Sequence, residues 1–197
     1  MTESIAARTE IRLAGEGGQG MILAGIILAE AAAIYDGKMA VQTQSYGPEA
    51  RGGASKAEVV ISDQEIDYPK AIKPDLLLAM NQKSCDAYFF DLKPAGMLIV
   101  DSTFVSQLPT TRAIAIPFTR IAREKLGKEI GANIIALGAL ATLSGAVSLS
   151  SLEAAVMSLI ASGTEDFNRK ALELGIESAR DALKTKAELE NYEDSSD

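Results

Sequence analysis

The stretch EIRLAGEGGQGMILAGIILAEAAAIYD, residues 10–36, joins a short apolar run to a longer one through a glycine-rich segment. The first run, at 10–15, has the length of a strand. The second, at 20–36, is rich in Ala, Ile and Leu over a length typical of a helix. A strand that passes through glycines into a helix is the starting unit of an α/β fold.

Short apolar runs continue through the first two thirds of the chain. Their aliphatic and β-branched content predicts strands at 39–44, 56–62, 75–80, 96–101 and 111–117. We therefore expect a single Rossmann-like α/β domain of three layers, with a largely parallel sheet and a helical C-terminal part. Sites in such sheets lie at the carboxyl ends of strands, so the loops after strands are where a site is expected.

The second half of the chain is predicted to be helical. GANIIALGALATLSGAV, at 131–147, carries no charge, but its glycines, its serine and its Asn are typical of a helix packed against protein rather than of a membrane span. Two further helices are expected at 151–162, which begins at a serine suited to cap it, and at 165–189.

The composition sets broad limits on class and partners. The chain has 197 residues, is 47% hydrophobic and carries a formal charge of −8. This length and hydrophobic fraction suffice for one core, so we expect one domain at 10–187. We also expect a flexible N-terminus at 1–9 and a disordered acidic tail at 188–197. The negative charge disfavours nucleic acid as a partner, because that binding rests on Lys and Arg. The first residues lack the pattern of a signal peptide, which favours the cytoplasm.

The chain contains no His and one Cys, Cys85. Nucleophilic mechanisms that use an imidazole base, structural zinc sites and iron–sulfur clusters need more His or Cys than this. We therefore expect no metal and no cofactor to be held by this chain alone, and no residue is nominated as catalytic. Cys85 itself is expected to be a small packed side chain near the start of a helix.

The segment Gly15–Gly20 matches the pattern G-x-G-x-x-G between a predicted strand and a predicted helix. Its glycines allow positive φ, and the helix N-terminus offers N–H donors to an anion such as phosphate, although the same glycines could serve only a tight turn. Binding of NAD or NADP also needs an acid at the end of the second strand. Asp36 lies before that strand and residues 44–46 contain no carboxylate, so this binding is disfavoured.

A second candidate loop, SYGPEARGG at 45–53, also follows a predicted strand and is expected at the same edge of the sheet. Arg51 is its most informative residue, because a guanidinium can grip a phosphate or carboxylate through two hydrogen bonds. The alternative is a surface ion pair between Arg51 and Glu49 or Glu58, which would contribute little. Both interpretations stay open.

Four segments of the chain resemble the gamma subunit of 2-oxoacid:ferredoxin oxidoreductases: GEGGQG at 15–20, QTQSYGPEARGG at 42–53, NIIALG at 133–138 and FNRKALELG at 167–175. The resemblance covers nearly the whole chain. The longer string at 41–70 is most similar to the stand-alone subunits of the branch that oxidises 2-oxoglutarate.

This resemblance implies a reaction of 2-oxoglutarate, coenzyme A and oxidised ferredoxin that yields succinyl-coenzyme A, CO2 and reduced ferredoxin. Pyruvate or a branched 2-oxoacid is the alternative substrate. It also implies alpha and beta partner subunits, allows for a ferredoxin-like delta subunit, and assigns thiamine diphosphate, Mg²⁺ and the iron–sulfur clusters to those partners. Coenzyme A is the cosubstrate.

The resemblance implies that this subunit packs beside the thiamine diphosphate site and is associated with access of coenzyme A, so that two of its loops face the cleft shared with that site or face a partner subunit. The residues carried over in this role are Gly17, Gly18, Gln19, Gly20, Ser45, Tyr46, Gly47, Glu49, Arg51, Gly52 and Gly53. The rival interpretations are a purely structural assembly subunit and, more distantly, a dehydrogenase domain that binds NAD(P). An apolar surface meant for partners could also pair two copies of the isolated chain as a homodimer.

Overall fold

The computed structural model of the chain describes residues 8–46 and 54–194. Within them one six-stranded sheet has the order β2-β3-β1-β4-β5-β6. The strands are β1 (Arg8–Glu16), β2 (Met39–Tyr46), β3 (Ala54–Ser62), β4 (Leu76–Ala79), β5 (Met97–Asp101) and β6 (Ile114–Ile116). The five strands predicted after the first are all present, with β6 shorter than the run at 111–117.

Strand β3 alone runs against the others. It pairs antiparallel with both β1 and β2, whereas β1, β4, β5 and β6 pair in parallel. Strand β2 therefore points the same way as β1, and the prediction of a largely parallel sheet is confirmed. Because β2 and β3 form a hairpin, the end of β2 and the start of β3 lie at the carboxyl edge of β1.

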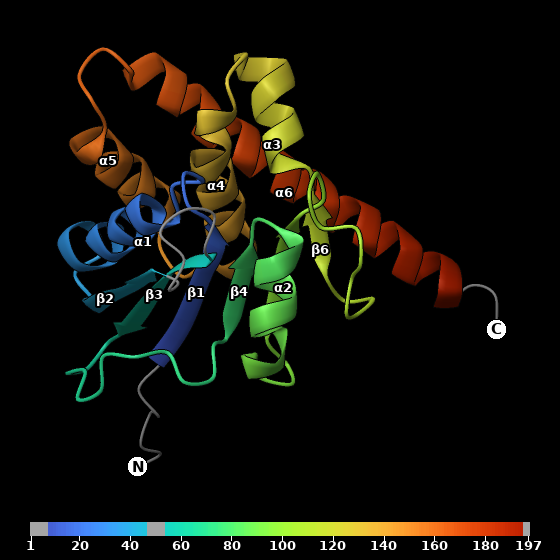
Figure 1. Cartoon of the computed structure of the whole chain (residues 1–197), viewed down its shortest axis with the longest axis horizontal. Helices are drawn as coiled ribbons and strands as arrows, with labels where there is room; N and C mark the ends of the chain where they lie inside the picture. The colour runs from blue at the N-terminus through green and yellow to red at the C-terminus, as the bar shows by residue number, and fades with distance from the viewer. Residues whose placement is uncertain (1–7, 47–53, 195–197) are drawn as a thin grey trace.

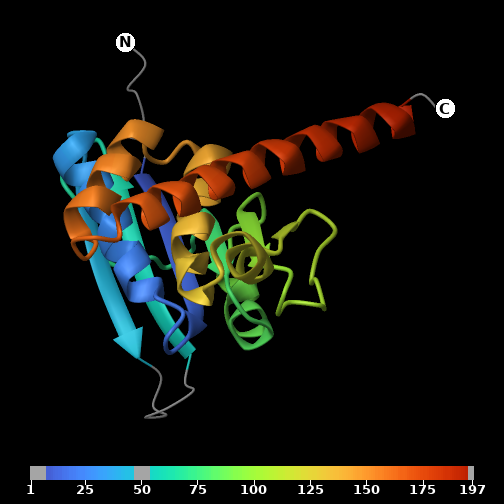
Figure 2. The same ribbon diagram turned by 90° about the horizontal axis from the view of Figure 1, so that it is seen from above.

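Helices cover both faces of the sheet. One face packs against α1 (Met21–Glu30), α4 (Ala132–Ser144), α5 (Leu149–Leu159) and α6 (Glu165–Asp194), and the other against α2 (Gln82–Tyr88). Helices α2 and α6 lie on opposite sides of the molecule (Figures 1 and 2). The remaining helical segments are α3 (Phe118–Ile121), the π-helical continuations Ala31–Tyr35 and Ala122–Leu126, and the 3-10 turns Phe89–Asp91 and Glu129–Gly131.

The alternation of side chains along β1 explains the two cores. Ile11 and Leu13 belong to the larger core under α1 and α4, whereas Ala14 belongs to the smaller core under α2. Cys85 is buried in the smaller core, as expected for a packed side chain. Burial raises the pKa of its thiol to about 11, so Cys85 stays a neutral thiol at neutral pH.

The uncharged helix α4 lies in the centre of the larger core, which confirms that it packs against protein. Two glycines allow its close approach to α6. A Cβ on Gly175 would lie 2.0 Å from the carbonyl oxygen of Ile135, and one on Gly138 would lie 2.6 Å from that of Leu172. Among the helices of the described residues, none is long and apolar enough to cross a membrane.

The two C-terminal helices differ from the sequence prediction at their ends. Helix α5 begins at Leu149, two residues before the predicted start, because the side chain of Ser148 accepts a hydrogen bond from the amide of Ser151. Helix α6 is 30 residues long and includes 188–194, where the sequence predicted a disordered tail. Its C-terminal part extends beyond the body of the molecule (Figure 2). The domain limits at 10 and 187 stay predictions.

Candidate functional site

The glycine loop at 17–20 joins the carboxyl end of β1 to α1, as predicted, and the side chain of Gln19 determines its shape. The amide of Glu16 donates to Oε1 of Gln19 at 2.7 Å, and the amide of Gln19 donates back to the carbonyl of Glu16 at 3.1 Å. Nε2 of Gln19 donates to the carbonyl of Met80, just beyond β4, at 3.3 Å. Gln19 therefore ties the ends of two neighbouring strands together.

Two of the loop glycines have positive φ, 99° at Gly18 and 73° at Gly20, which only glycine adopts readily. They differ in their surroundings. The space beside Gly18 is open, whereas a Cβ on Gly20 would lie 2.5 Å from Nδ2 of Asn133 in α4. Gly17 also faces open space. The loop thus presents Gly17 and Gly18 outward and uses Gly20 for packing.

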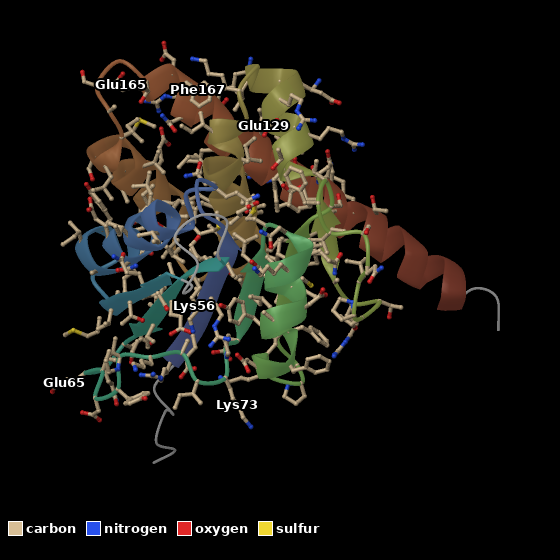
Figure 3. All side chains as sticks on the ribbon, in the orientation of Figure 1. Lys56, Glu65, Lys73, Glu129, Glu165 and Phe167 are labelled. Carbon is tan, nitrogen blue, oxygen red and sulfur yellow. The ribbon has the colours of Figure 1, made fainter. Side chains whose placement is uncertain are left out.

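A hollow of about 490 Å³ lies between this loop and the start of α4. A second hollow of about 470 Å³ adjoins it and shares Leu23, Ile130 and Asn133 in its lining. We call the two hollows together the carboxyl-edge cleft. Figure 3 shows Glu129, from the first hollow, and Phe167, from the second, on the same side of the molecule.

The lining of this cleft is mainly apolar. The side chain of Ile130 is 75% exposed, and Leu23 and Phe104 are also exposed. Two carboxylates lie at the first hollow, Glu16 and Glu129, and Nη2 of Arg123 is 2.6 Å from the carboxylate of Glu129. Among the described residues, the first hollow is lined by no Lys or Arg. The first hollow therefore suits protein contact better than it suits a multiply charged phosphate chain, whereas Lys128 adds a cation to the lining of the second.

The ends of the second loop lie beside the first. Ser55, at the start of β3, pairs with both Gly15 and Tyr46, and its hydroxyl donates to the carbonyl of Gly15 at 3.3 Å. Ser45 is exposed on β2. The expectation that both loops share one edge of the sheet is therefore confirmed at their ends. The loop residues Gly47, Glu49, Arg51, Gly52 and Gly53 lie outside the described residues, and their roles stay predictions.

Glu58, considered above as a partner for Arg51, is already engaged in the structure. Its carboxylate is buried on β3 and lies 2.8 Å from the guanidinium of Arg12 and 3.0 Å from the ammonium of Lys56. Both cations also lie over the ring of Tyr88, at 5.1 and 5.4 Å from its centre. This cluster fixes the base of the hairpin that carries the second loop.

The geometry does not fit dinucleotide binding. Strand β3 separates β2 from β1, so the end of β2 is not next to the glycine loop as it is in a Rossmann fold. Asp36 lies before β2, as predicted, and it caps α5. Its carboxylate accepts from the amide of Ser148 at 2.8 Å and from the hydroxyl of Ser151 at 2.6 Å.

Comparison with known proteins agrees with this geometry. The sequence model of the family described as pyruvate ferredoxin/flavodoxin oxidoreductase matches residues 10–178. The chain belongs to this family. The resemblance found from the sequence segments is therefore confirmed.

Three members illustrate the relationship. The chain is 52% identical to the 2-oxoglutarate synthase subunit KorC of Methanocaldococcus jannaschii, over 90% of this chain and 97% of that one. It is 36% identical to the ketoisovalerate oxidoreductase subunit VorA of Methanothermobacter thermautotrophicus, over 88% of this chain and 37% of that one. The crystal structure of the keto/oxoacid ferredoxin oxidoreductase gamma subunit from Geobacter sulfurreducens superposes with a TM-score of 0.82 at 50% identity, over 89% of this chain and 98% of that one.

Among the described residues, no side chains are suited to hold an iron–sulfur cluster or a metal ion. Its one thiol, on Cys85, is buried and neutral, so it does not fit as a cluster ligand. Within the described parts of the chain no group of three or more His, Cys, Asp or Glu side chains could hold a metal ion.

Asn133 is one of the cleft residues that sequence reasoning did not nominate. Asn133 is the second residue of α4, contacts Gly20 and lines both hollows, but it was noted only as part of the segment NIIALG. Its position depends on the packing of α4 against α1, which no local pattern indicates. Gln19 was nominated as facing a ligand or partner; it makes its amide hydrogen bonds within the chain and also lines the first hollow, so the nominated role stays a prediction.

Proposed function

We propose that this chain is the gamma subunit of a 2-oxoglutarate:ferredoxin oxidoreductase. The complex would convert 2-oxoglutarate, coenzyme A and oxidised ferredoxin to succinyl-coenzyme A, CO2 and reduced ferredoxin. The observation that carries the proposal is the 52% identity to a KorC subunit along nearly the full length of both chains. The identity to the ketoisovalerate relative is lower, at 36%.

Within such a complex this chain would supply surface and positioning. Thiamine diphosphate with Mg²⁺ on a partner subunit would supply the decarboxylation chemistry, and iron–sulfur clusters held by partners would pass electrons to ferredoxin. The described residues of the cleft offer apolar side chains and glycines, which suit the exclusion of water and close approach of another chain. We assign no catalytic residue to this chain.

The contact surface would be the carboxyl edge of the sheet. Gly17 and Gly18 face open space there, and Ser45 and Tyr46 end β2 at the same edge of the sheet. An apolar patch such as Ile130 with Leu23 and Phe104 supports contact with alpha or beta subunits, because monomeric proteins rarely leave such patches uncovered. We propose the cytoplasm as the compartment and ferredoxin as the final acceptor.

A second candidate is a subunit that serves assembly and touches no ligand. The internal hydrogen bonds of Gln19 favour it, because they show that part of the glycine motif maintains the fold. The two candidates differ in what a loop variant does. A change that spares assembly but alters the coenzyme A requirement supports a site role, whereas loss of assembly alone supports the second candidate.

Co-expression with the neighbouring reading frames tests the assignment. The chain carries an affinity tag, and the purified material is examined for further subunits and for iron and thiamine diphosphate. We expect partner chains to co-purify and to carry iron and thiamine diphosphate. Recovery of this chain alone from a cell that produces all the candidate partners would contradict it.

A further inference from the structure

Asn133 differs from the other buried polar side chains around the carboxyl-edge cleft. It is 6% exposed, and it lines both hollows. Thr119, at the first hollow, donates its hydroxyl to Asp101 at 2.5 Å. Asn168, at the second, donates its Nδ2 to the carbonyl of Thr164 at 2.9 Å. Nδ2 of Asn133 donates to no residue in the described parts of the chain, and it is not among the fully buried polar atoms without a partner, so solvent reaches it from the cleft.

The orientation of this carboxamide is fixed by the chain. Its Oδ1 accepts from the amide of Ile134 at 2.9 Å, so the amide nitrogen is turned to the opposite side. There it lies against Gly20, where a Cβ would be only 2.5 Å away. A glycine with positive φ thus leaves room for an N–H donor at the floor of the cleft.

The N-termini of two helices favour a negative partner for this donor. Helices α1 and α4 both begin at the cleft, and neither N-cap residue, Gly20 or Gly131, makes a side-chain capping bond. The partial positive charges of the two helix N-termini therefore add near Asn133. Of the two nearby carboxylates, Glu129 is paired with Arg123 and Glu16 is exposed to solvent.

We infer that the Asn133 carboxamide is a recognition group that donates from Nδ2 to an anionic oxygen of the molecule that fills the cleft. The ligand chemistry is a single carboxylate or phosphoryl oxygen set among apolar contacts to residues such as Leu23 and Ile130. This goes beyond the assignment as a gamma subunit, since it names a residue and a ligand chemistry in the cleft. The test uses the chain without partners, so its failure and that of the subunit assignment are distinguishable.

The experiment is an NMR titration of the ¹⁵N-labelled full chain with inorganic phosphate and, separately, with acetate. Sodium chloride keeps the ionic strength constant. The side-chain NH2 signals of Asn133 are identified as the pair that disappears in the Asn133→Asp variant. Asn81→Asp is the matched control, since it adds the same charge and keeps the carboxyl oxygen that caps α2.

At least one anion is expected to shift the NH2 signals of Asn133 and the backbone amide of Gly20 in a saturable way. A response to phosphate alone identifies a phosphoryl ligand, and a response to acetate identifies a carboxylate. Asn133→Ala and Asn133→Asp should weaken the binding about tenfold or more, as loss of a hydrogen bond to a charged group predicts, and Asn81→Asp should not.

The inference is overturned if neither anion moves these signals saturably in the unmodified chain. It is also overturned if the Gly20 signal responds equally in folded Asn133→Ala. The backbone amide of Gly20 is assigned in the unmodified chain by triple-resonance experiments, so a variant that fails to fold does not remove the test.

Discussion

The guanidinium of Arg12 on β1 and the carboxylate of Glu58 on β3 form a buried ion pair, 2.8 Å apart, beneath the hairpin that carries the second loop. Arg12 is 3% exposed and Glu58 is 6% exposed. Arg12 also pairs with Asp91 and donates to the carbonyl of Ala71. Arg12 therefore links β1 to β3, to the turn that follows α2 and to the segment that precedes β4.

Replacement of Glu58 by Ala should lower the free energy of unfolding by about 3 kcal/mol, because it leaves Arg12 buried with one fewer partner. Urea denaturation measures this change. Glu153→Ala is the control, since Glu153 pairs with Arg169 on the surface and its loss should cost less than about 1 kcal/mol. Equal effects of the two changes would contradict the structural role of the buried pair.

The close approach of α4 and α6 makes Gly175 sensitive to any side chain. Gly175→Ala should lower the free energy of unfolding by about 3 kcal/mol, because its Cβ would lie 2.0 Å from the carbonyl oxygen of Ile135. Gly17→Ala makes the same substitution in open space and should leave the unfolding midpoint nearly unchanged. A Gly175→Ala protein as stable as Gly17→Ala would show that the helices do not pack in this way.

Gly18→Val tests whether open space at the glycine loop is used by another molecule. The positive φ at Gly18 predicts a strain of about 1–2 kcal/mol, and the branched side chain should also block a partner. Gly37→Val carries comparable strain in open space away from the cleft. We expect the assembled activity to fall for Gly18→Val and to persist for Gly37→Val. Equal activity of the two complexes would show that the loop serves only as a turn.

Asp36 should make the cap of α5 sensitive to acid. Partial burial raises the pKa of this carboxyl, but the hydrogen bonds from Ser151 and Ser148 outweigh it, so the pKa lies below the usual value of 3.8. A pKa lowered by folding stabilises the folded state above the unfolded pKa, and this stabilisation is lost as pH falls through the folded value. Asp36→Asn should therefore lower stability by about 1 kcal/mol at pH 7. The difference in stability between the variant and the unmodified protein should shrink below pH 3.8. A difference in urea midpoint that stays constant as pH falls would contradict a lowered pKa of Asp36.

Arg51→Ala tests the second loop in the assembled complex. We expect the subunits to stay together and the KM for coenzyme A to rise about tenfold, because a guanidinium that grips an anion contributes more than a neutral hydrogen bond. Arg180→Ala removes an exposed cation from α6 and serves as the control. Unchanged coenzyme A kinetics in an intact Arg51→Ala complex would exclude this role.

Local sequence patterns predicted most elements of the fold. The apolar runs and glycines around residues 10–36 predicted β1, the loop and α1, because strand and helix periodicities are local properties. The insertion of β3 between β1 and β2 was not predicted, since strand partners are set by contacts between distant segments. The start of α5 was also misplaced, because Ser148 and Asp36 cap it together.

The candidate site could likewise be predicted from the sequence only in part. The edge shared by the two loops followed from their positions after strands, and the pairing of Ser55 with Gly15 and with Tyr46 places the ends of the loops side by side. The internal role of Gln19 and the contact between Gly20 and Asn133 could not be predicted, because both depend on side chains from distant elements that meet only in the folded chain.

The most direct test of the account is the activity of the purified complex. The chain is co-expressed with its neighbouring reading frames, and coenzyme A-dependent reduction of a viologen dye is measured with 2-oxoglutarate, pyruvate and 2-oxoisovalerate, with a matched preparation that lacks this chain. We predict the fastest reduction with 2-oxoglutarate and its loss without this chain. Equal activity without this chain would contradict the central claim, and a preference for pyruvate or 2-oxoisovalerate would contradict the assigned substrate.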